Sequence, residues 1–301
     1  MAERTQSVPG QKLEFSHTDK LYFPDDGISK GDLLTYYERI APTILPHLHD
    51  RPLTMQRFPD GIAEDGFYQK QAADYFPDWL SRVDVEVKED QSSQEQVMAN
   101  DAAALLYLVN QGMITPHIWL SRAGSLNYPD KLIFDLDPPE DNFDLVRFAA
   151  KELRRRLEDL GLTPFVMTTG SKGLHIAVAL DGETDFDEVR AFARKLAEIV
   201  ADENPERLTT ALRKDQREGR LFLDYVRNAY GQTGVAPYGV RALAGAPVAT
   251  PLDWDEVGNS DLGSQAYTIK NIFKRLGQKA DPWKYFYRHP ASAAKAAERL
   301  V

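Results

Sequence analysis

The sequence contains no cysteine. This excludes disulfide bonds, thiolate zinc sites and cysteine nucleophiles, and it fits a reducing compartment such as the cytoplasm. Long hydrophobic runs are also missing, since no stretch approaches the roughly 18 apolar residues of a membrane-spanning helix. The first residues, Met1 to Gln6, show neither the apolar core nor the cleavage pattern of a secretory signal. We therefore expect a cytoplasmic protein with no membrane partner.

Basic residues are in the minority. Lys and Arg number 36 and Asp and Glu number 46, so the net charge is −10. Taken alone, this balance argues against a nucleic-acid partner, because phosphate binding needs cationic surface. The charge is unevenly spread, however, since residues 264–301 hold eight basic and two acidic side chains. The composition thus permits a basic groove on an acidic body whose carboxylates hold metal.

The N-terminal part shows mixed strand and helix patterns without an internal repeat. Alternation and amphipathic spacing predict strands at 12–17, 53–58 and 83–87, and helices at 30–44 and 101–109. Ser29 is the expected N-cap of the first helix and Asn100 that of the second.

The middle of the chain defines the expected fold class. The patterns predict, in order, a strand at 132–137, a helix at 143–160, strands at 164–169 and 174–180, a helix at 184–202 and a strand at 221–226. This is the split βαβ order of ferredoxin-like and RNA-recognition-like sheets, an α/β (α+β) fold. Helices should cover one face of the sheet, and the N-terminal part should roof the other.

No stretch rich in Gly, Pro and Ser divides the chain. We therefore expect a single domain whose lobes share a cleft. Its expected parts are an N-terminal mixed α/β lobe at about 1–125, a core at about 126–260 and a C-terminal helical segment at about 261–301, with helices near 269–276 and 291–300.

Two aspartates close the strand at 132–137. Asp135 and Asp137 stand two residues apart, so both carboxylates should point to one face, roughly 6.5 Å apart along the chain. Such a pair can bridge Mg²⁺ or Mn²⁺, and two cations about 3.5–4 Å apart suit in-line attack at phosphorus. The alternative is a solvated strand end, but the apolar residues before Asp135 favour a cation.

Asp224 lies inside another apolar strand pattern, where a carboxylate needs a strong partner. An ion pair with Arg220 or Arg227 is one solution. The other is a metal cradle of three carboxylates, which requires the two aspartate-bearing strands to be neighbours.

Thr169 to His175 reads Thr-Gly-Ser-Lys-Gly-Leu-His. Its glycines allow a tight turn whose backbone N–H groups, Ser171 hydroxyl and Lys172 ammonium suit phosphate oxygens. The Walker pattern is absent, and an ordinary hairpin turn with Lys172 in solvent is the alternative. His175 alternates with apolar neighbours, which places it on the expected face of the aspartates.

Arginines lie both before and after the Asp224 strand in the sequence. Arg241 has the guanidinium geometry for bidentate phosphate binding. The basic cluster before the strand has a solvated loop as its alternative reading, and its members are Arg213, Lys214, Arg217 and Arg220.

Three motifs together resemble one family: Phe134–Pro138, Gly170–His175 and Phe222–Tyr225. They match those of the archaeo-eukaryotic primase (AEP) superfamily. More narrowly, the chain resembles the polymerase domain of bacterial end-joining, ATP-dependent DNA ligases (ligase D), or a stand-alone primase-polymerase relative, over about residues 12–290. The resemblance implies a template-dependent DNA/RNA polymerase that fills gaps or extends ends at double-strand breaks during non-homologous end joining. A preference for ribonucleotides and an ability to prime are further implications.

The resemblance also implies roles for individual residues. Two divalent cations, Mn²⁺ or Mg²⁺, would bind the catalytic aspartates Asp135, Asp137 and Asp224. The incoming NTP or dNTP would contact Ser171, Lys172, His175, His117 and Arg241. The 5′-phosphate of the DNA would bind Lys20 and Lys30, and nucleobases would stack on Phe67 and Tyr68. Gln56 stands where some relatives have a basic residue, and Tyr68 where some have Phe.

The implied partners are DNA with gaps or 3′ overhangs and a 5′-phosphate, together with Ku and a DNA ligase, which suggests nucleoid association. The expected helix start at Lys30 would add free backbone N–H groups to the phosphate site. Two other classes compete with the polymerase. One is a non-catalytic module that binds or bridges DNA ends, which has no need of clustered carboxylates. The other is a metal-dependent phosphoesterase or nuclease, for which a His-rich site is missing.

Overall fold

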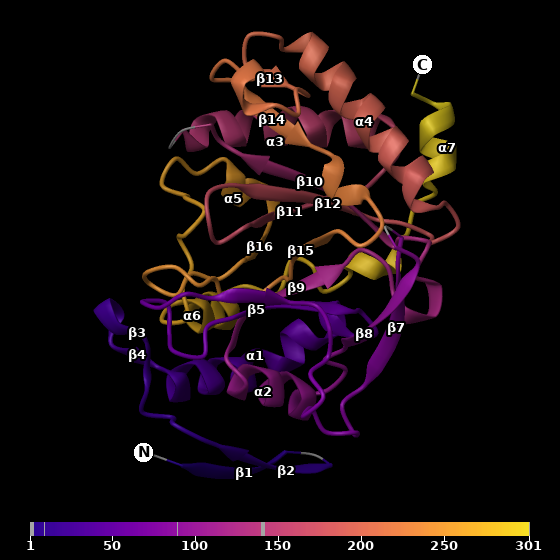
Figure 1. Cartoon of the computed structure of the whole chain (residues 1–301). Coiled ribbons are helices and arrows are strands. Elements are labelled where there is room, and N and C mark those ends of the chain that lie inside the picture. Colours follow the sequence, from indigo (N-terminus) through magenta and orange to yellow (C-terminus); the bar gives the residue numbers. More distant parts are fainter. Residues whose placement is uncertain (1–2, 9, 89, 140–141, 301) are drawn as a thin grey trace.

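The computed structural model describes residues 3–8, 10–88, 90–139 and 142–300. Two β-sheets lie face to face in the middle of the molecule, and helices cover the outer face of each (Figure 1). Within those ranges, no helix combines the length and the apolar character needed to cross a membrane.

The upper sheet in Figure 1 has six strands in the order β13-β14-β10-β12-β11-β16. Their bounds are Leu208–Thr209, Leu221–Asp224, Lys131–Asp137, Leu174–Ala179, Pro164–Thr168 and Pro251–Leu252. The four central strands pair antiparallel, and α3 (Phe143–Asp159) and α4 (Phe186–Glu203) complete the predicted split βαβ order. The predicted fold class is therefore confirmed. The outer strands β13 and β16 were not predicted, because two residues are too few to show a period.

Residues of β10 alternate between the two faces of this sheet. Leu132, Phe134 and Leu136 are buried in the cluster formed with α3 and α4, whereas Ile133 belongs to a separate cluster between the sheets. Because the period of a strand is two, Asp135 and Asp137 share the inner face with Ile133. The same alternation places His175 there, since Leu174 and Ile176 of β12 pack on the helices. Both predictions are confirmed.

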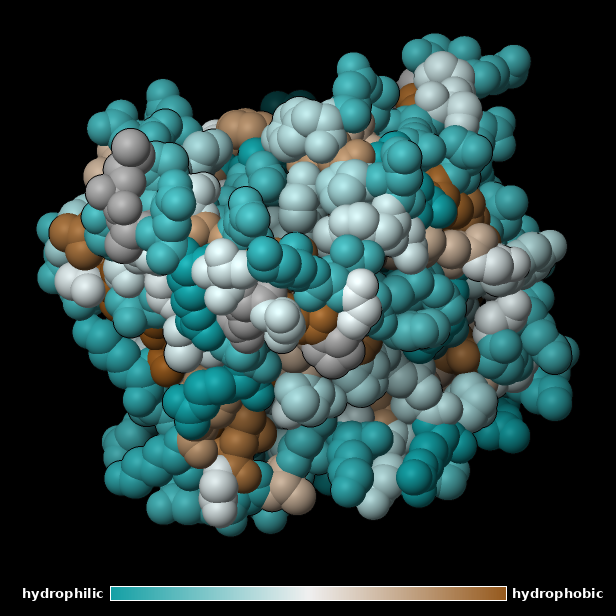
Figure 2. All heavy atoms as spheres, turned by 90° about the horizontal axis from the view of Figure 1, so that it is seen from below, coloured by the Kyte–Doolittle hydropathy of each residue, from teal (hydrophilic) through white to brown (hydrophobic). Residues whose placement is uncertain are grey.

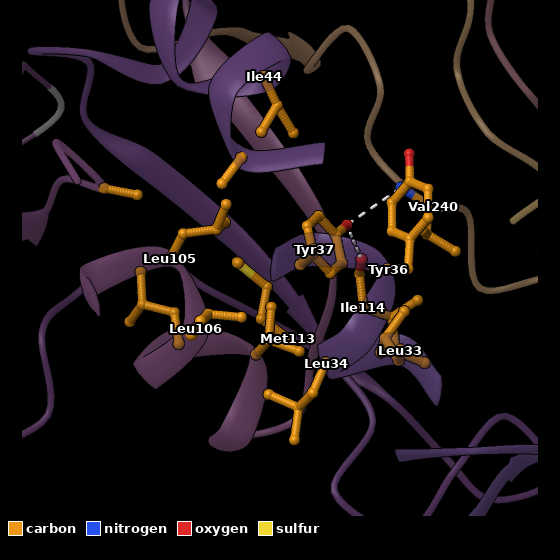
Figure 3. Packing of buried hydrophobic residues seen from close by; sticks show 14 of the residues in the cluster. Leu33, Leu34, Tyr36, Tyr37, Ile44, Leu105, Leu106, Met113, Ile114 and Val240 are labelled. Carbon is orange, nitrogen blue, oxygen red and sulfur yellow. Dashed lines mark hydrogen bonds between the residues drawn. The ribbon is translucent and has the colours of Figure 1, made fainter. Parts of the chain in front are cut away.

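The lower sheet has the order β15-β9-β5-β6. Its strands are Thr233–Val235, Met113–Trp119, Leu53–Arg57 and Phe67–Gln69, and α1 (Lys30–Leu48) and α2 (Ala102–Asn110) pack beneath it (Figure 1). Figure 3 shows how α1 is fastened: the hydroxyl of Tyr37 donates to the carbonyl of Ile114 at 2.6 Å and accepts from the N–H of Val240 at 3.0 Å. Val240, which follows β15 in the chain, is thereby hydrogen-bonded to α1 of the N-terminal half.

Smaller elements surround the two sheets. The strands are β1 (Arg4–Val8), β2 (Gln11–Phe15), β3 (Leu21–Phe23), β4 (Ile28–Ser29), β7 (Arg82–Val87) and β8 (Ser92–Val97). The helices are α5 (Trp254–Val257), α6 (Ile272–Gln278) and α7 (Ala293–Glu298). Short 3-10 turns lie at Pro24–Asp26, Ala123–Ser125, Lys214–Gln216, Val226–Asn228 and Phe286–Arg288.

The two predicted helix caps had different outcomes. Ser29 caps α1 in a capping box with Asp32, as predicted, although the helix continues to Leu48 rather than ending near residue 44. The cap predicted for α2 was wrong: Asp101 accepts from the N–H of Ala104 at 2.8 Å. The side chain of Asn100 is used elsewhere, since it accepts from the N–H of Asp50 at 2.7 Å and donates to its carboxylate.

Candidate active site

Two of the predicted aspartates and His175 form one row across three adjacent strands. In the antiparallel register, Asp135 of β10 lies directly opposite Asp224 of β14 on one side and His175 of β12 on the other. Asp137 follows two residues along β10, on the same inner face. The two strands that carry the aspartates are therefore adjacent in the sheet, a point that the sequence left open.

Arg227 reaches into this row from the 3-10 turn after β14. Its Nε lies 3.3 Å from Asp135 Oδ2 and 3.9 Å from Asp224 Oδ2. On the other side of Asp135, Oδ1 lies 3.4 Å from His175 Nε2. Of the two arginines considered for Asp224, Arg227 is the neighbour, whereas Arg220 donates to the carbonyls of Arg217 and Gln216.

The three carboxylates have different electrostatic surroundings. Burial favours the neutral form of Asp135, but the charges of His175 and Arg227 outweigh it and hold its pKa below the ordinary value. Desolvation and the negative charge of Asp135 raise the pKa of both Asp137 and Asp224. Asp137 and Asp224 therefore lack the positive charge that would fully compensate them.

The donor set suits a hard divalent cation. Carboxylate oxygens are the ligands that Mg²⁺ and Mn²⁺ prefer. Among the described residues, Asp135 Oδ1 is a buried acceptor without a hydrogen bond. No three His, Asp or Glu side chains in the described ranges are already grouped closely enough to share one ion. Because Arg227 stands beside Asp135 Oδ2 and Asp224 Oδ2, a cation that binds between these two oxygens competes with this guanidinium.

A cavity of about 80 Å³ opens between the two sheets over this row. The upper sheet contributes Asp135, Asp137 and His175, and the lower sheet contributes His117 of β9 and residues 233–235 of β15. Thr169, Ser171, Arg227 and Arg241 complete the wall, whereas Asp224 is not part of it. The structure therefore brings the predicted nucleotide contacts Ser171, His175, His117 and Arg241 together around the carboxylates of Asp135 and Asp137. The contribution of β15 was missed, because Thr-Gly-Val has no side chain typical of a catalytic site.

His117 is held in its neutral form. Burial, followed by the charges of Arg241 and Arg227, lowers its pKa to about 3. Within the described part of the chain, its Nε2 is a buried atom without a hydrogen-bond partner. A neutral imidazole with an unused nitrogen at a cavity wall is suited to one hydrogen bond with a ligand.

The Gly-Ser-Lys-Gly loop is partly closed on itself. Thr169 Oγ1 accepts from the N–H groups of Ser171 and Gly173, at 3.3 and 3.2 Å, so these two donors are not free for phosphate as the sequence suggested. Arg241 Nη1 donates to the carbonyl of Thr169 at 2.8 Å. Lys172 lies outside the cavity over the carboxylates. It borders a basic cavity of about 320 Å³ together with Asp137, and a further hollow of about 490 Å³ together with Ser171.

Lys20 and Lys30 lie near each other at the start of α1. Burial and the charge of Lys20 lower the pKa of Lys30 to about 8. Lys30 Nζ donates to the carbonyl of Ser16 at 2.8 Å, and Lys20 pairs with Asp60. The expectation of free N–H groups here is wrong, because a β3–β4 hairpin and the capping box consume them. The N–H groups of residues 30, 31 and 32 bond to the Lys20 carbonyl, the Thr18 carbonyl and Ser29 Oγ.

The predicted aromatic pair is divided between two faces. Phe67 and Tyr68 are consecutive residues of β6, so their side chains point to opposite sides of the sheet. Tyr68 faces the cavity, with its ring centroid 5.7 Å from that of His117. Phe67 pairs in register with Arg57, whose guanidinium lies 5.4 Å from the Phe67 ring. Both rings are largely exposed, 47% for Phe67 and 59% for Tyr68.

Comparison with known proteins agrees with this architecture. The family model described as "LigD, primase-polymerase domain" matches residues 29–283. The bifunctional non-homologous end joining protein LigD of Bacillus subtilis is 33% identical over 93% of this chain and 45% of its own length. The multifunctional LigD protein of Pseudomonas aeruginosa is 33% identical over 90% of this chain and 32% of its own. The chain therefore spans less than half the length of these relatives.

A solved structure provides the corresponding comparison in three dimensions. The polymerase domain of Mycobacterium tuberculosis ligase D, in complex with DNA, aligns with a TM-score of 0.86 at 28% identity and covers 93% of this chain and 99% of its own. The similarity thus extends over nearly the whole fold, including both sheets that enclose the carboxylate row. The chain belongs to the LigD primase-polymerase domain family.

Proposed function

We propose that this chain is a template-dependent nucleotidyltransferase that adds nucleotides to the 3′ end of gapped or broken DNA during non-homologous end joining. The observation that supports this most strongly is the row of Asp224, Asp135 and His175 on three adjacent strands, with Asp137 beside it. Relatives named for non-homologous end joining, and a structural neighbour solved with DNA, support the choice of substrate.

In this proposal, Asp135, Asp137 and Asp224 hold two Mg²⁺ or Mn²⁺ ions, which when bound acidify the primer 3′-hydroxyl and offset charge on the leaving pyrophosphate. Ser171 and His117 donate to the triphosphate from opposite walls of the cavity. Arg241, anchored on the Thr169 carbonyl, presents its remaining N–H groups to the same phosphates. His175 orients Asp135, and Lys172 adds positive charge from the neighbouring cavity.

The DNA-binding part of the proposal uses exposed or partly exposed side chains around the lower sheet. Lys20 and Lys30 bind a downstream 5′-phosphate, for which Lys20 has to leave Asp60. Tyr68 stacks on a base next to the cavity, an interaction worth about 1–3 kcal/mol. Ku and a ligase component are the proposed protein partners, and the bacterial nucleoid is the proposed location. Preference for ribonucleotides and priming activity complete the proposal.

A primer-extension assay tests it. The substrate is a gapped duplex with a downstream 5′-phosphate, supplied with Mn²⁺ or Mg²⁺ and either ribo- or deoxynucleotides. Templated additions that stop when the gap is filled are expected, with more product from ribonucleotides. If the 3′ end stays unextended while a gel shift still depends on the 5′-phosphate, the chain is an end-binding module instead. Shortened primers would indicate a nuclease.

A further inference from the structure

The far face of the lower sheet, turned away from the catalytic cavity, holds a second set of exposed aromatic groups. Phe67 points to this face together with Arg57, its partner in the β5–β6 register. Arg57 Nη1 also donates to the hydroxyl of Tyr75 at 3.1 Å. One buried guanidinium thus links two exposed rings, Phe67 and Tyr75, on the side of β6 that Tyr68 does not reach.

Tyr75 is exposed yet held in place. Its residue surface is 61% accessible, more than that of Phe67 or Tyr68. The hydroxyl is fixed by Arg57, and the ring packs edge-on against Phe76 with centroids 5.0 Å apart. An aromatic side chain with few rotatable bonds and a fixed orientation loses little entropy when a planar group stacks on it. Tyr75 belongs to none of the hydrophobic core clusters of the described residues, so core packing does not explain why the ring is held at the surface.

A hollow of about 380 Å³ continues from Tyr75. Tyr75, Trp79 and Tyr107 form its aromatic side, and Lys12 and Glu14 of β2 lie on the other. This volume falls in the range of roughly 300–1,000 Å³ that is typical of small-ligand sites, and it is large enough for a nucleobase. Figure 2, which views the molecule from the side of α1, α2 and the β1–β2 hairpin, shows a largely hydrophilic surface broken by small hydrophobic areas.

The position of the hollow favours single-stranded nucleic acid as its occupant. Lys30 Nζ donates to the carbonyl of Ser16, and the N–H of Ser16 donates to Asn110, which lines the hollow. The proposed 5′-phosphate site therefore adjoins the hollow. Rings that accept any base and cations that attract the backbone are the combination found in sequence-independent single-strand binding. β6 is the edge strand of its sheet, so both of its faces, with Tyr68 on one and Phe67 on the other, lie at the border of the sheet.

We propose that Tyr75 and the hollow beside Trp79 and Tyr107 stack bases of an unpaired DNA strand, separately from the bases that Tyr68 contacts at the cavity. The inference rests on the proposed function for its ligand class, since both require DNA. It adds a binding site that is needed for overhangs longer than the active site can hold and is dispensable for short gaps.

Binding to labelled duplexes with pyrimidine overhangs of increasing length, without metal or nucleotide, tests the site. Tyr75→Ala should weaken binding of long overhangs by roughly 5- to 150-fold and leave blunt duplexes unaffected. Because a base contact is lost rather than a phosphate contact, the salt dependence of binding should stay the same. Tyr75→Phe keeps the ring and should lose less affinity for long overhangs than Tyr75→Ala. Tyr128→Ala, at a tyrosine that is 44% exposed elsewhere, is the matched control.

A second measurement does not depend on a variant that folds. Overhangs carrying a photoreactive 5-iodouracil at successive positions should crosslink to Tyr75 in the wild-type protein, and abasic substitution at the same position should weaken binding. Unchanged overhang binding by Tyr75→Ala, or crosslinks confined to Tyr68, would overturn the inference. In an Asp137→Ala background, Tyr75→Ala should weaken overhang binding by the same factor. The result therefore does not depend on polymerase activity. Failure to bind any DNA would count against the proposed function as well.

Discussion

Asp135 and Asp224 are direct cross-strand partners, and Arg227 stands close to both carboxylates, at 3.3 and 3.9 Å. Like charges placed directly opposite on adjacent strands destabilise a sheet unless a cation separates them. Here the protein supplies that cation itself. The arrangement implies that Arg227 offsets part of the negative charge of the row when metal is absent and competes with metal when it is present.

Arg227→Ala should therefore lower the melting temperature of the metal-free protein, with a loss of only about 1 kcal/mol because the Arg227 side chain is 43% exposed. Added Mn²⁺ should then raise the melting temperature more than it does in wild type, since stabilisation grows with affinity for the folded state. Thermal unfolding across a Mn²⁺ titration measures both effects. Arg227→Lys, which keeps the charge, is the control. An equal response to Mn²⁺ in all three proteins would show that Arg227 does not compete with metal.

Asp137 allows activity and stability to be separated. Desolvation and the charge of Asp135 raise its pKa, so the ionised carboxylate is unfavourable in the metal-free fold. Asp137→Asn should abolish primer extension, by about 10³-fold or more, through loss of a metal ligand and its transition-state stabilisation. The same change should leave DNA binding intact and slightly raise the metal-free melting temperature. Wild-type extension rates would remove Asp137 from the metal site.

The sequence predicted most about the site where a strand could be recognised. The apolar run at 132–137, stopped by two prolines, predicted a buried strand, and the strand period of two then placed Asp135 and Asp137 on one face. The same rule would have separated Phe67 from Tyr68, but β6 has only three residues and was not recognised as a strand. Short strands owe their conformation to the neighbours they pair with, which a local pattern does not contain.

Other features depend on contacts between distant segments. Asn100 and Asp101 are both good capping residues, and only the interaction of Asn100 with Asp50 decides that Asp101 caps α2. Lys172 and Ser171 are adjacent in the sequence and share one hollow, yet only Ser171 also lines the cavity over the carboxylates. Likewise, the backbone donors expected at Lys30 are consumed by residues 18 and 20, which precede the helix.

Recognition of a 5′-phosphate should depend on pH through Lys30. Burial and the charge of Lys20 lower its pKa to about 8. The ammonium is thus present at pH 7 and is lost as pH rises through about 8, and a bound phosphate shifts this loss upward. The preference for 5′-phosphorylated over 5′-hydroxyl gaps should fall between pH 7.5 and about 9.5. Lys30→Arg should retain the preference across this range. A flat profile in wild type would exclude Lys30 from the phosphate site.

The same shift has a consequence for stability. In the unfolded chain Lys30 has its ordinary pKa, so between pH 8 and about 10.5 the unfolded state binds more protons than the folded one. Lys30 therefore makes the fold more stable as pH rises through this window, while phosphate recognition weakens. Opposite trends in melting temperature and in phosphate preference would separate the effect of Lys30 from general alkaline unfolding.

Gly173 brings the Gly-Ser-Lys-Gly loop into contact with the end of β10. A Cβ at this position would overlap the carbonyl of Leu136 and come within 2.9 Å of Asp137 Oδ1, so only glycine lets the loop lie against the end of β10. Gly173→Ala should destabilise the fold by about 1–3 kcal/mol through overpacking. It should also reduce extension beyond what the stability loss explains, because Asp137 and Ser171 are displaced together. Gly277→Ala, in α6 with open space around it, should be neutral or stabilising. Calorimetry and extension rates below the melting temperature distinguish the two effects, and a stable, fully active Gly173→Ala would show that the loop can move away from β10 without cost.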